Sequence, residues 1–197
     1  ILGLEKHENV SHIFQTFRAK IRMTAFELFT KEAMEYVLKL HTELSSPIES
    51  DPPFFILIET ETDTEEKTQS LLSTFETCVE KGWVTDGVIS QNLEQADQFW
   101  KYRDYISESL APYTPYKNDI SVRISQVTQF MKEADALLRK EYPQFKVVWF
   151  GHIGDGNLHV NILKPSAILN VVSVSTPTFL VIICTTSPFR SCCMLPT

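Results

Sequence analysis

Two histidines stand seven residues apart in the glycine-rich segment GHIGDGNLHVNI, residues 151–162. The imidazoles of His152 and His159 flank a Gly-Asp-Gly turn, and imidazole is a common ligand of divalent metals. Asp155-Gly156 is a strong signal for a two-residue hairpin, because both central residues of that turn need positive φ. Such a turn would place His152 directly opposite His159, with Cβ atoms about 4.5 to 5.5 Å apart. The spacing therefore predicts two imidazoles that converge on one metal ion.

Two histidines do not complete a metal site. Catalytic zinc usually has three protein ligands, and Asp155 is the only acidic residue after Glu141. We therefore expect the third ligand to be absent from this chain. The residues leave open an alternative, a glycine-rich hairpin with partly exposed histidines that bind nothing. Asn161, two residues after His159, would face the same way and offer an amide to a substrate or cofactor.

The segments that must position these residues alternate between extended and helical patterns. Strands are predicted at 23–29, 53–60, 84–90, 117–124 and 146–154, and helices at 30–44, 63–82, 92–110 and 125–142. Asn92 and Gln95 form a capping-box pattern at the start of one helix. The alternation predicts an α/β or α+β class with one sheet. Half-polar strands favour the α+β class, with a ferredoxin-like, mostly antiparallel sheet and helices packed on one face, over a doubly covered parallel sheet.

Composition and charge limit the function classes. The chain has 197 residues, of which 43% are hydrophobic and 22% charged, enough for one domain with a sizeable core. A net charge of -7 argues against a sequence-independent grip on nucleic acid, which needs clustered Lys and Arg. No stretch is long and apolar enough for a membrane span. The chain begins at Ile1 without a targeting segment, so we expect a fragment.

The last part of the chain differs in composition from the rest. Residues 1–165 form the predicted domain, whereas 166–197 carry a single charged residue, Arg190. One interpretation is a β-prone extension of the domain. The interpretation we favour is a low-charge tail that is not part of the domain, such as an alternative end of the chain.

Three stretches resemble the C-terminal substrate-binding domain of FAD-linked oxidases of the D-2-hydroxyacid dehydrogenase group. They are GHIGDGNLHVNI, VTDGVISQNLEQADQFWKYRDYISESL and YKNDISV, and the resemblance extends from about residue 10 to Pro165. Within the group, the chain looks most like the D-2-hydroxyglutarate dehydrogenases. The resemblance implies that the chain is incomplete at both ends.

The resemblance also implies roles for individual residues. His152 and His159 would be catalytic and hold a divalent metal, usually zinc, which a Glu-His-Gly segment absent here would complete. The substrate would be bound by Arg103, Ser107, Lys117 and Asn161, and Asn161 would also contact the cofactor. Arg103 and Ser107 are one helical turn apart and would share a helix face. Without the resemblance, the favoured interpretation of Arg103 is a solvated helix face beside Asp104.

The implied activity is the oxidation of D-2-hydroxyglutarate to 2-oxoglutarate, with hydride transfer to FAD and a metal that polarises the substrate. FAD would be bound mainly by a missing N-terminal domain, so we expect the fragment alone to be inactive. An electron-transfer flavoprotein would accept the electrons, and a homodimer is compatible with the family. The location would be mitochondrial in a eukaryote and cytoplasmic in a bacterium.

Other functions compete with this one. D-lactate dehydrogenase and the glycolate oxidase subunit belong to the same family. A metal-dependent hydrolase is a rival enzyme class. The sequence shows neither a third metal ligand nor a general base beside the histidines, such as the glutamate of an HExxH helix. A non-catalytic ferredoxin-like domain, which binds a metal or a partner, is the alternative from another class.

Overall fold

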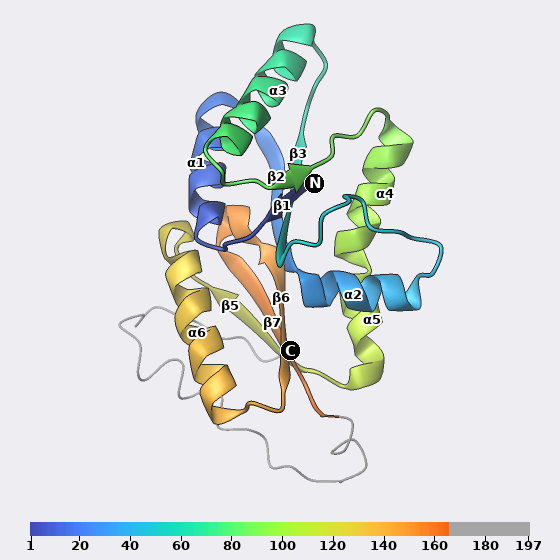
Figure 1. Ribbon diagram of the computed structural model, residues 1–197, viewed down its shortest axis with the longest axis vertical. Coiled ribbons are helices and arrows are strands. Elements are labelled where there is room, and N and C mark those ends of the chain that lie inside the picture. Colours follow the sequence, from blue (N-terminus) through green and yellow to red (C-terminus); the bar gives the residue numbers. More distant parts are fainter. Residues whose placement is uncertain (166–197) are drawn as a thin grey trace.

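A computed structural model describes residues 1–165, which form one seven-stranded sheet flanked by helices (Figure 1). The strand order is β4-β1-β3-β2-β6-β7-β5, and every neighbouring pair is antiparallel. The strands are β1 (Leu2–Leu4), β2 (Met23–Thr30), β3 (Phe54–Thr60), β4 (Asp86–Gly87), β5 (Tyr116–Ser121), β6 (Lys146–His152) and β7 (Asn157–Leu163). The predicted α+β class and antiparallel sheet are confirmed. The predictions for 166–197 fall outside the described residues.

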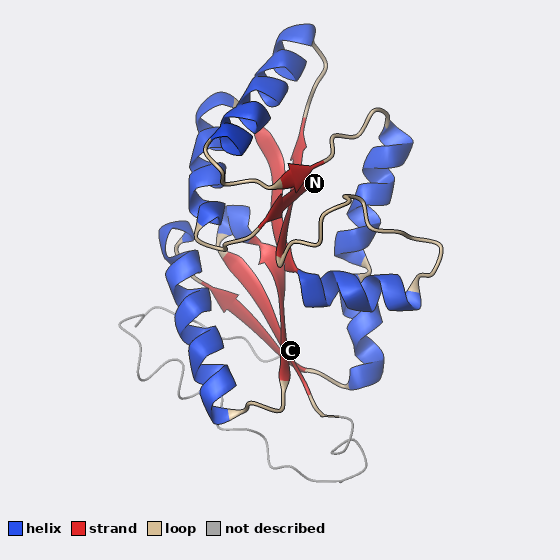
Figure 2. Ribbon diagram, in the orientation of Figure 1, coloured by secondary structure: helices blue, strands red, loops and turns tan. Residues whose placement is uncertain are grey.

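From β2 onward, helices and strands alternate broadly as the sequence predicts, whereas β1 and the helix that follows it were not predicted (Figure 2). The helices are α1 (Asn9–Lys20), α2 (Lys31–Leu40), α3 (Glu65–Glu80), α4 (Leu93–Asp104), α5 (Ile106–Leu110) and α6 (Val127–Glu141). Among residues 1–165, no helix combines the length and the apolar character needed to cross a membrane.

The helices cover both faces of the sheet, whereas the sequence predicted one. Helices α1, α3 and α6 lie on one side, and α2, α4 and α5 lie on the other (Figure 1). Each set packs on its own hydrophobic cluster. The central strand β2 is accordingly buried at five consecutive positions, from Phe26 to Thr30, because both of its faces are covered.

Alternation along β2 determines which face each side chain enters. Phe26 and Leu28 belong to the cluster under α1, α3 and α6, whereas Phe29 belongs to the cluster under α2, α4 and α5. Residues two apart on a strand share a face, so Glu27 lies with Phe29. A carboxylate is therefore placed in the layer between the sheet and α4.

The predicted helix cap at Asn92 gives a first testable outcome. The Asn92 side chain accepts a hydrogen bond from the Gln95 backbone N–H, at 2.8 Å, at the start of α4. We expect Asn92→Ala to lower the free energy of unfolding by about 1 kcal/mol, measured by urea denaturation. Gln98→Ala, at an exposed position of the same helix, is the control and should change stability by only a few tenths. An equal loss in both variants would contradict the capping role.

Candidate functional site

The turn between the two motif histidines is longer than a two-residue hairpin. Strand β6 ends at His152, a 3-10 helix η3 (Ile153–Asp155) follows, and β7 begins at Asn157. The predicted pairing of His152 with His159 is wrong, because Phe150 is opposite His159. The turn takes this form because Ile153 is buried in the core and its carbonyl accepts from the Gly156 N–H at 3.0 Å.

The two imidazoles nevertheless lie on one face, by a different register. Phe150 and His152 are two residues apart on β6 and so point to the same side. His159, opposite Phe150, points to that side as well. The His152 and His159 ring centroids are 5.7 Å apart, with the rings nearly perpendicular. The two side chains thus lie on one side, as predicted, without the predicted hairpin.

Each histidine is held by a carboxylate through its Nδ1 atom. His152 Nδ1 lies 2.8 Å from Glu27 Oε1, and His159 Nδ1 lies 2.5 Å from Asp119 Oδ1. An Nδ1–H that donates to a carboxylate leaves the lone pair on Nε2. Metal-binding histidines are commonly oriented in this way. The two Nε2 atoms are therefore the candidate ligands.

Arg103 reaches the same face from α4. Its Nε–H donates to Glu27 Oε2 at 2.8 Å, and its guanidinium carbon lies 5.0 Å from the Phe150 ring centroid. Nη2 is 3.3 Å from His152 Nε2, so a metal ion on that nitrogen would compete with Arg103 for the lone pair. Only 7% of Arg103 is exposed, which excludes the solvated helix face.

The other predicted substrate-binding residues have no described contact with Arg103 or with the two histidines. Lys117 is opposite Asn161, and Asn161 is opposite Val148 of β6. Both therefore lie on the face of the histidines, with Lys117 exposed and Asn161 buried. Ser107 is exposed on α5, beyond the end of α4, and no described contact joins it to Arg103.

Two carboxylates of the site, Glu27 and Asp119, were not predicted as site residues. Glu27 is the one charged residue in the strand pattern MTAFELF, an unusual position for a buried acid. Asp119 shares a strand face with Lys117, which is a weaker signal.

The donor set fits a divalent cation in part. Within residues 1–165, no cluster of three or more His, Cys, Asp or Glu side chains is arranged for a metal. The two Nε2 atoms with carboxylate support make two of the three protein ligands of a catalytic zinc site. A third would have to come from outside the described residues.

A groove of about 570 Å³ opens beside the histidine turn. Its lining includes Glu27, His152 and Asp155 from the site, and Arg18, Arg22 and Trp100 from α1, the loop after it and α4. Arg103, His159, Lys117 and Asn161 are not among its lining residues, so the groove reaches the site only at Glu27 and His152.

Residues 1–169 of the chain match the family of FAD linked oxidases, C-terminal domain. The chain belongs to this family. Its curated relatives include the D-2-hydroxyglutarate dehydrogenases of Stutzerimonas stutzeri, 49% identical over 85% of this chain, and of Xanthomonas citri pv. viticola, 48% identical over 85%. The mitochondrial D-2-hydroxyglutarate dehydrogenase of Arabidopsis thaliana is 36% identical over 71%.

These relatives are longer than the matched region. The aligned part covers 36% of the Stutzerimonas enzyme, 35% of the Xanthomonas enzyme and 25% of the Arabidopsis enzyme. The chain thus spans about a third or less of each relative and corresponds to the C-terminal domain of an FAD-linked oxidase. The sequence resemblance to this family is confirmed.

Proposed function

We propose that the chain forms the substrate- and metal-binding part of an FAD-dependent D-2-hydroxyacid dehydrogenase that oxidises D-2-hydroxyglutarate to 2-oxoglutarate. The observation that carries the proposal is the buried Arg103 beside two carboxylate-supported histidines, on one sheet face of an FAD-linked oxidase domain. Oxidation of a 2-hydroxy acid requires a cation that binds the substrate carboxylate. It also requires a group that activates the hydroxyl, which a metal held by two histidine nitrogens would supply.

Arg103 and Lys117 would bind the two carboxylates of D-2-hydroxyglutarate. The Nη1 group of Arg103 has no hydrogen-bond partner within residues 1–165, and a guanidinium binds a carboxylate through charge-assisted hydrogen bonds. Lys117 is an exposed cation on the same face. D-Lactate has one carboxylate and would use only one of these cations. Asn161 would add a polar contact, and Ser107 is proposed as a further contact on the family resemblance alone.

His152 and His159 would hold a divalent metal, which we propose is zinc, through their Nε2 atoms. When bound, such an ion lowers the pKa of the substrate hydroxyl and polarises it. Glu27 and Asp119 keep the Nδ1 atoms engaged, so the lone pairs stay directed at the site.

FAD is the proposed hydride acceptor, in keeping with the FAD-linked family. A domain outside this chain would bind most of the cofactor, so the chain alone is expected to be inactive. An electron-transfer flavoprotein is the proposed electron acceptor of the complete enzyme.

A substrate comparison tests the proposal. In a full-length flavoprotein that carries this chain, we would measure dye reduction with D-2-hydroxyglutarate, D-lactate and glycolate. The value of kcat/KM should be at least tenfold higher for D-2-hydroxyglutarate, since only this substrate engages both cations. A preference for D-lactate would overturn the substrate assignment. A protein that binds zinc but oxidises none of the three would support the non-catalytic alternative.

Loss of one histidine gives a prediction that does not depend on turnover. His152→Ala should lower the zinc affinity of the full-length protein at least tenfold, because one of two nitrogen ligands is removed. Competition with a chromophoric chelator would measure this affinity. His12→Ala is the matched control, because His12 stacks on Trp83 at 5.0 Å and belongs to α1. Equal zinc affinities in the two variants would contradict the proposed ligand.

A further inference from the structure

We infer that Glu27 is a positioning residue which fixes Arg103 and His152 together, so that anion binding and metal binding are aligned by one carboxylate. The inference rests on the proposed function for the substrate and the metal. It goes beyond that function because it concerns a residue that would touch neither.

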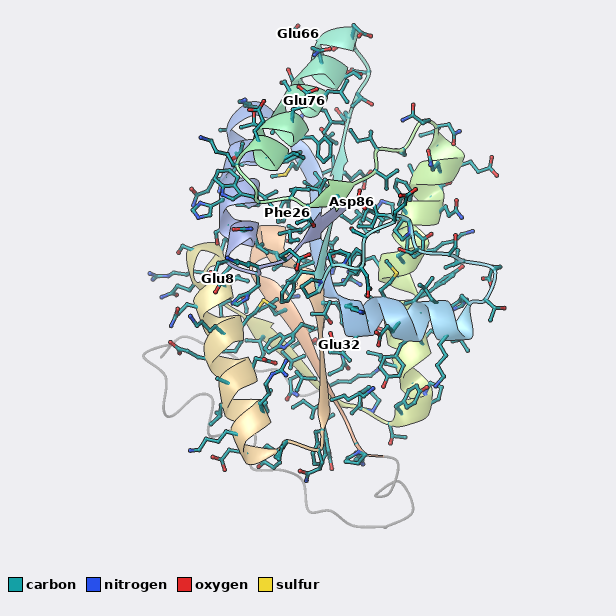
Figure 3. All side chains as sticks on the ribbon, viewed as in Figure 1. Glu8, Phe26, Glu32, Glu66, Glu76 and Asp86 are labelled. Carbon is teal, nitrogen blue, oxygen red and sulfur yellow. The ribbon has the colours of Figure 1, made fainter. Side chains whose placement is uncertain are left out.

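Glu27 lies in a place where a carboxylate is costly without partners. It is 3% exposed, on the central strand β2, and its neighbour Phe26 is labelled in Figure 3. A buried charge is tolerated only when it is paired and hydrogen-bonded. Both oxygens meet this need, Oε1 with His152 and Oε2 with Arg103, each at 2.8 Å. Each carboxylate oxygen of Glu27 is therefore bound to one residue of the site.

The contact to Arg103 fixes the plane of the guanidinium. Glu27 takes the Nε–H, and the guanidinium carbon lies 5.0 Å from the Phe150 ring centroid. Nη2 then faces His152 Nε2 at 3.3 Å, which leaves Nη1 as the group without a hydrogen-bond partner among residues 1–165. Without Glu27, the flexible side chain of Arg103 would have no described acidic partner to hold this orientation.

The contact to His152 fixes the ring and its tautomer. His152 is 47% exposed at its side chain, so packing alone constrains the ring weakly. A carboxylate on Nδ1 supplies the constraint and leaves the lone pair on Nε2. Losing such a partner typically weakens metal binding about 10- to 100-fold.

Because one carboxylate holds both Arg103 and His152, their positions are coupled, which two separate carboxylates would not achieve. Any change that moves Glu27 disturbs the guanidinium and the imidazole at the same time. Glutamine cannot replace it, because the two donors meet different oxygens of Glu27 and an amide has an oxygen in only one of those two places. Its NH2 group would then face the other donor.

The test uses Glu27→Gln in the full-length flavoprotein that carries this chain. We expect zinc affinity to fall about 10- to 100-fold in a chelator competition. Binding of 2-oxoglutarate, a dicarboxylate measured by calorimetry without turnover, should weaken at least tenfold. Glu76→Gln is the matched control, because Glu76 is exposed on α3, which lies on the other side of the sheet from α4 (Figure 1), and should change neither value.

A second variant keeps the test decisive if Glu27→Gln does not fold. Glu27→Asp preserves the charge but is one methylene shorter, so it cannot reach both partners. We expect it to lose at least tenfold in zinc affinity or in 2-oxoglutarate affinity. Wild-type values for both would show that only the charge matters and would overturn the positioning role.

Combination with Arg103→Ala separates indirect from direct action. In protein stripped of metal with a chelator, Glu27 would act on the dicarboxylate only through Arg103, so the double variant Glu27→Gln/Arg103→Ala should bind 2-oxoglutarate within twofold of Arg103→Ala alone. A further tenfold loss in the double variant would contradict this. Zinc affinity should fall in the double variant relative to Arg103→Ala alone, in which the competition of Arg103 for the His152 lone pair is removed and zinc affinity should not fall.

The two proposals fail in different ways. If the wild-type protein oxidises D-2-hydroxyglutarate but Glu27→Gln and Glu27→Asp match it in both affinities, the positioning role is wrong and the proposed function stands. If the wild type oxidises no 2-hydroxy acid while Glu27→Gln still weakens both affinities, the proposed function is wrong and the positioning role stands. A wild type that binds neither zinc nor 2-oxoglutarate overturns both.

Discussion

Replacing Arg103 with alanine is expected to lower kcat/KM for D-2-hydroxyglutarate in a full-length enzyme by roughly 30- to 5,000-fold. Truncating one member of a buried, hydrogen-bonded charge pair costs about 2 to 5 kcal/mol of binding, and each 1.4 kcal/mol is tenfold. The proposed pair forms between the guanidinium and a substrate carboxylate, and because Arg103 is buried the pair would be desolvated.

The same substitution should also lower stability, because Glu27 would lose its arginine partner. Breaking a buried ion pair typically costs about 3 to 5 kcal/mol. His152 stays in contact with Glu27, so we expect the lower end of this range. Urea denaturation would give the change in the free energy of unfolding. Activity must then be measured well below the temperature at which the variant unfolds.

Two further variants separate the charge from its geometry. Arg103→Lys keeps the charge but cannot form the two-pronged contact of a guanidinium, so we expect an intermediate loss of kcat/KM. Arg139→Ala is the control, since Arg139 lies on α6 and pairs with Asp135 at the surface. An exposed pair contributes less than about 1 kcal/mol to stability, and kcat/KM should not change. Wild-type kinetics in Arg103→Ala would refute the substrate contact.

Local patterns in the sequence predict the elements and part of the site. The helical character of 92–110 and its Asn92 cap follow from local hydrogen bonds, although Tyr105 divides the predicted single helix into α4 and α5. Strand alternation predicts that Lys117 and Asp119 share a face. These features depend on residues close together in the chain. Local rules of this kind are therefore sufficient for them.

The rest of the site depends on which strands become neighbours. Glu27 meets Arg103 across 76 positions and His152 across 125. Nothing in MTAFELF reveals that β2 will lie beside β6. Family resemblance assigns roles to Arg103 and His152 but is silent on the carboxylate that joins them.

The prediction that helices cover only one face of the sheet was wrong for a related reason. Half-polar strands such as β5 suggested a sheet with one solvated side, and β5 is indeed at the edge of the sheet. The apolar run FFILI in β3 pointed the other way, since a strand buried on both faces reads as a continuous apolar run. The edge strands thus predicted a sheet covered on one face, and the central strands predicted a sheet covered on both. The prediction from the central strands agrees with the structure.

The glycines of the motif give the second large effect, and they divide into two kinds. Gly151 and Gly156 have φ of +155° and +73°, values that a residue with a side chain rarely adopts. A Cβ atom on Gly151 would lie 2.4 Å from the Asn157 carbonyl oxygen, and one on Gly156 would lie 2.0 Å from that of Val122. Both obstacles are backbone, which cannot rotate away. Gly154 differs, because its Cβ would meet Phe26 at an ordinary 3.5 Å.

We therefore expect Gly151→Ala and Gly156→Ala each to destabilise the domain by about 3 kcal/mol or more, through backbone strain and overlap. Gly154→Ala, the matched control, should change stability by less than about 1 kcal/mol. Urea denaturation of the three full-length variants would measure this. Gly151 precedes His152, so a backbone shift there should also move the imidazole away from Glu27 and weaken zinc binding in folded protein. If Gly154→Ala were as damaging as the other two, the motif would need its glycines for something other than these two close approaches.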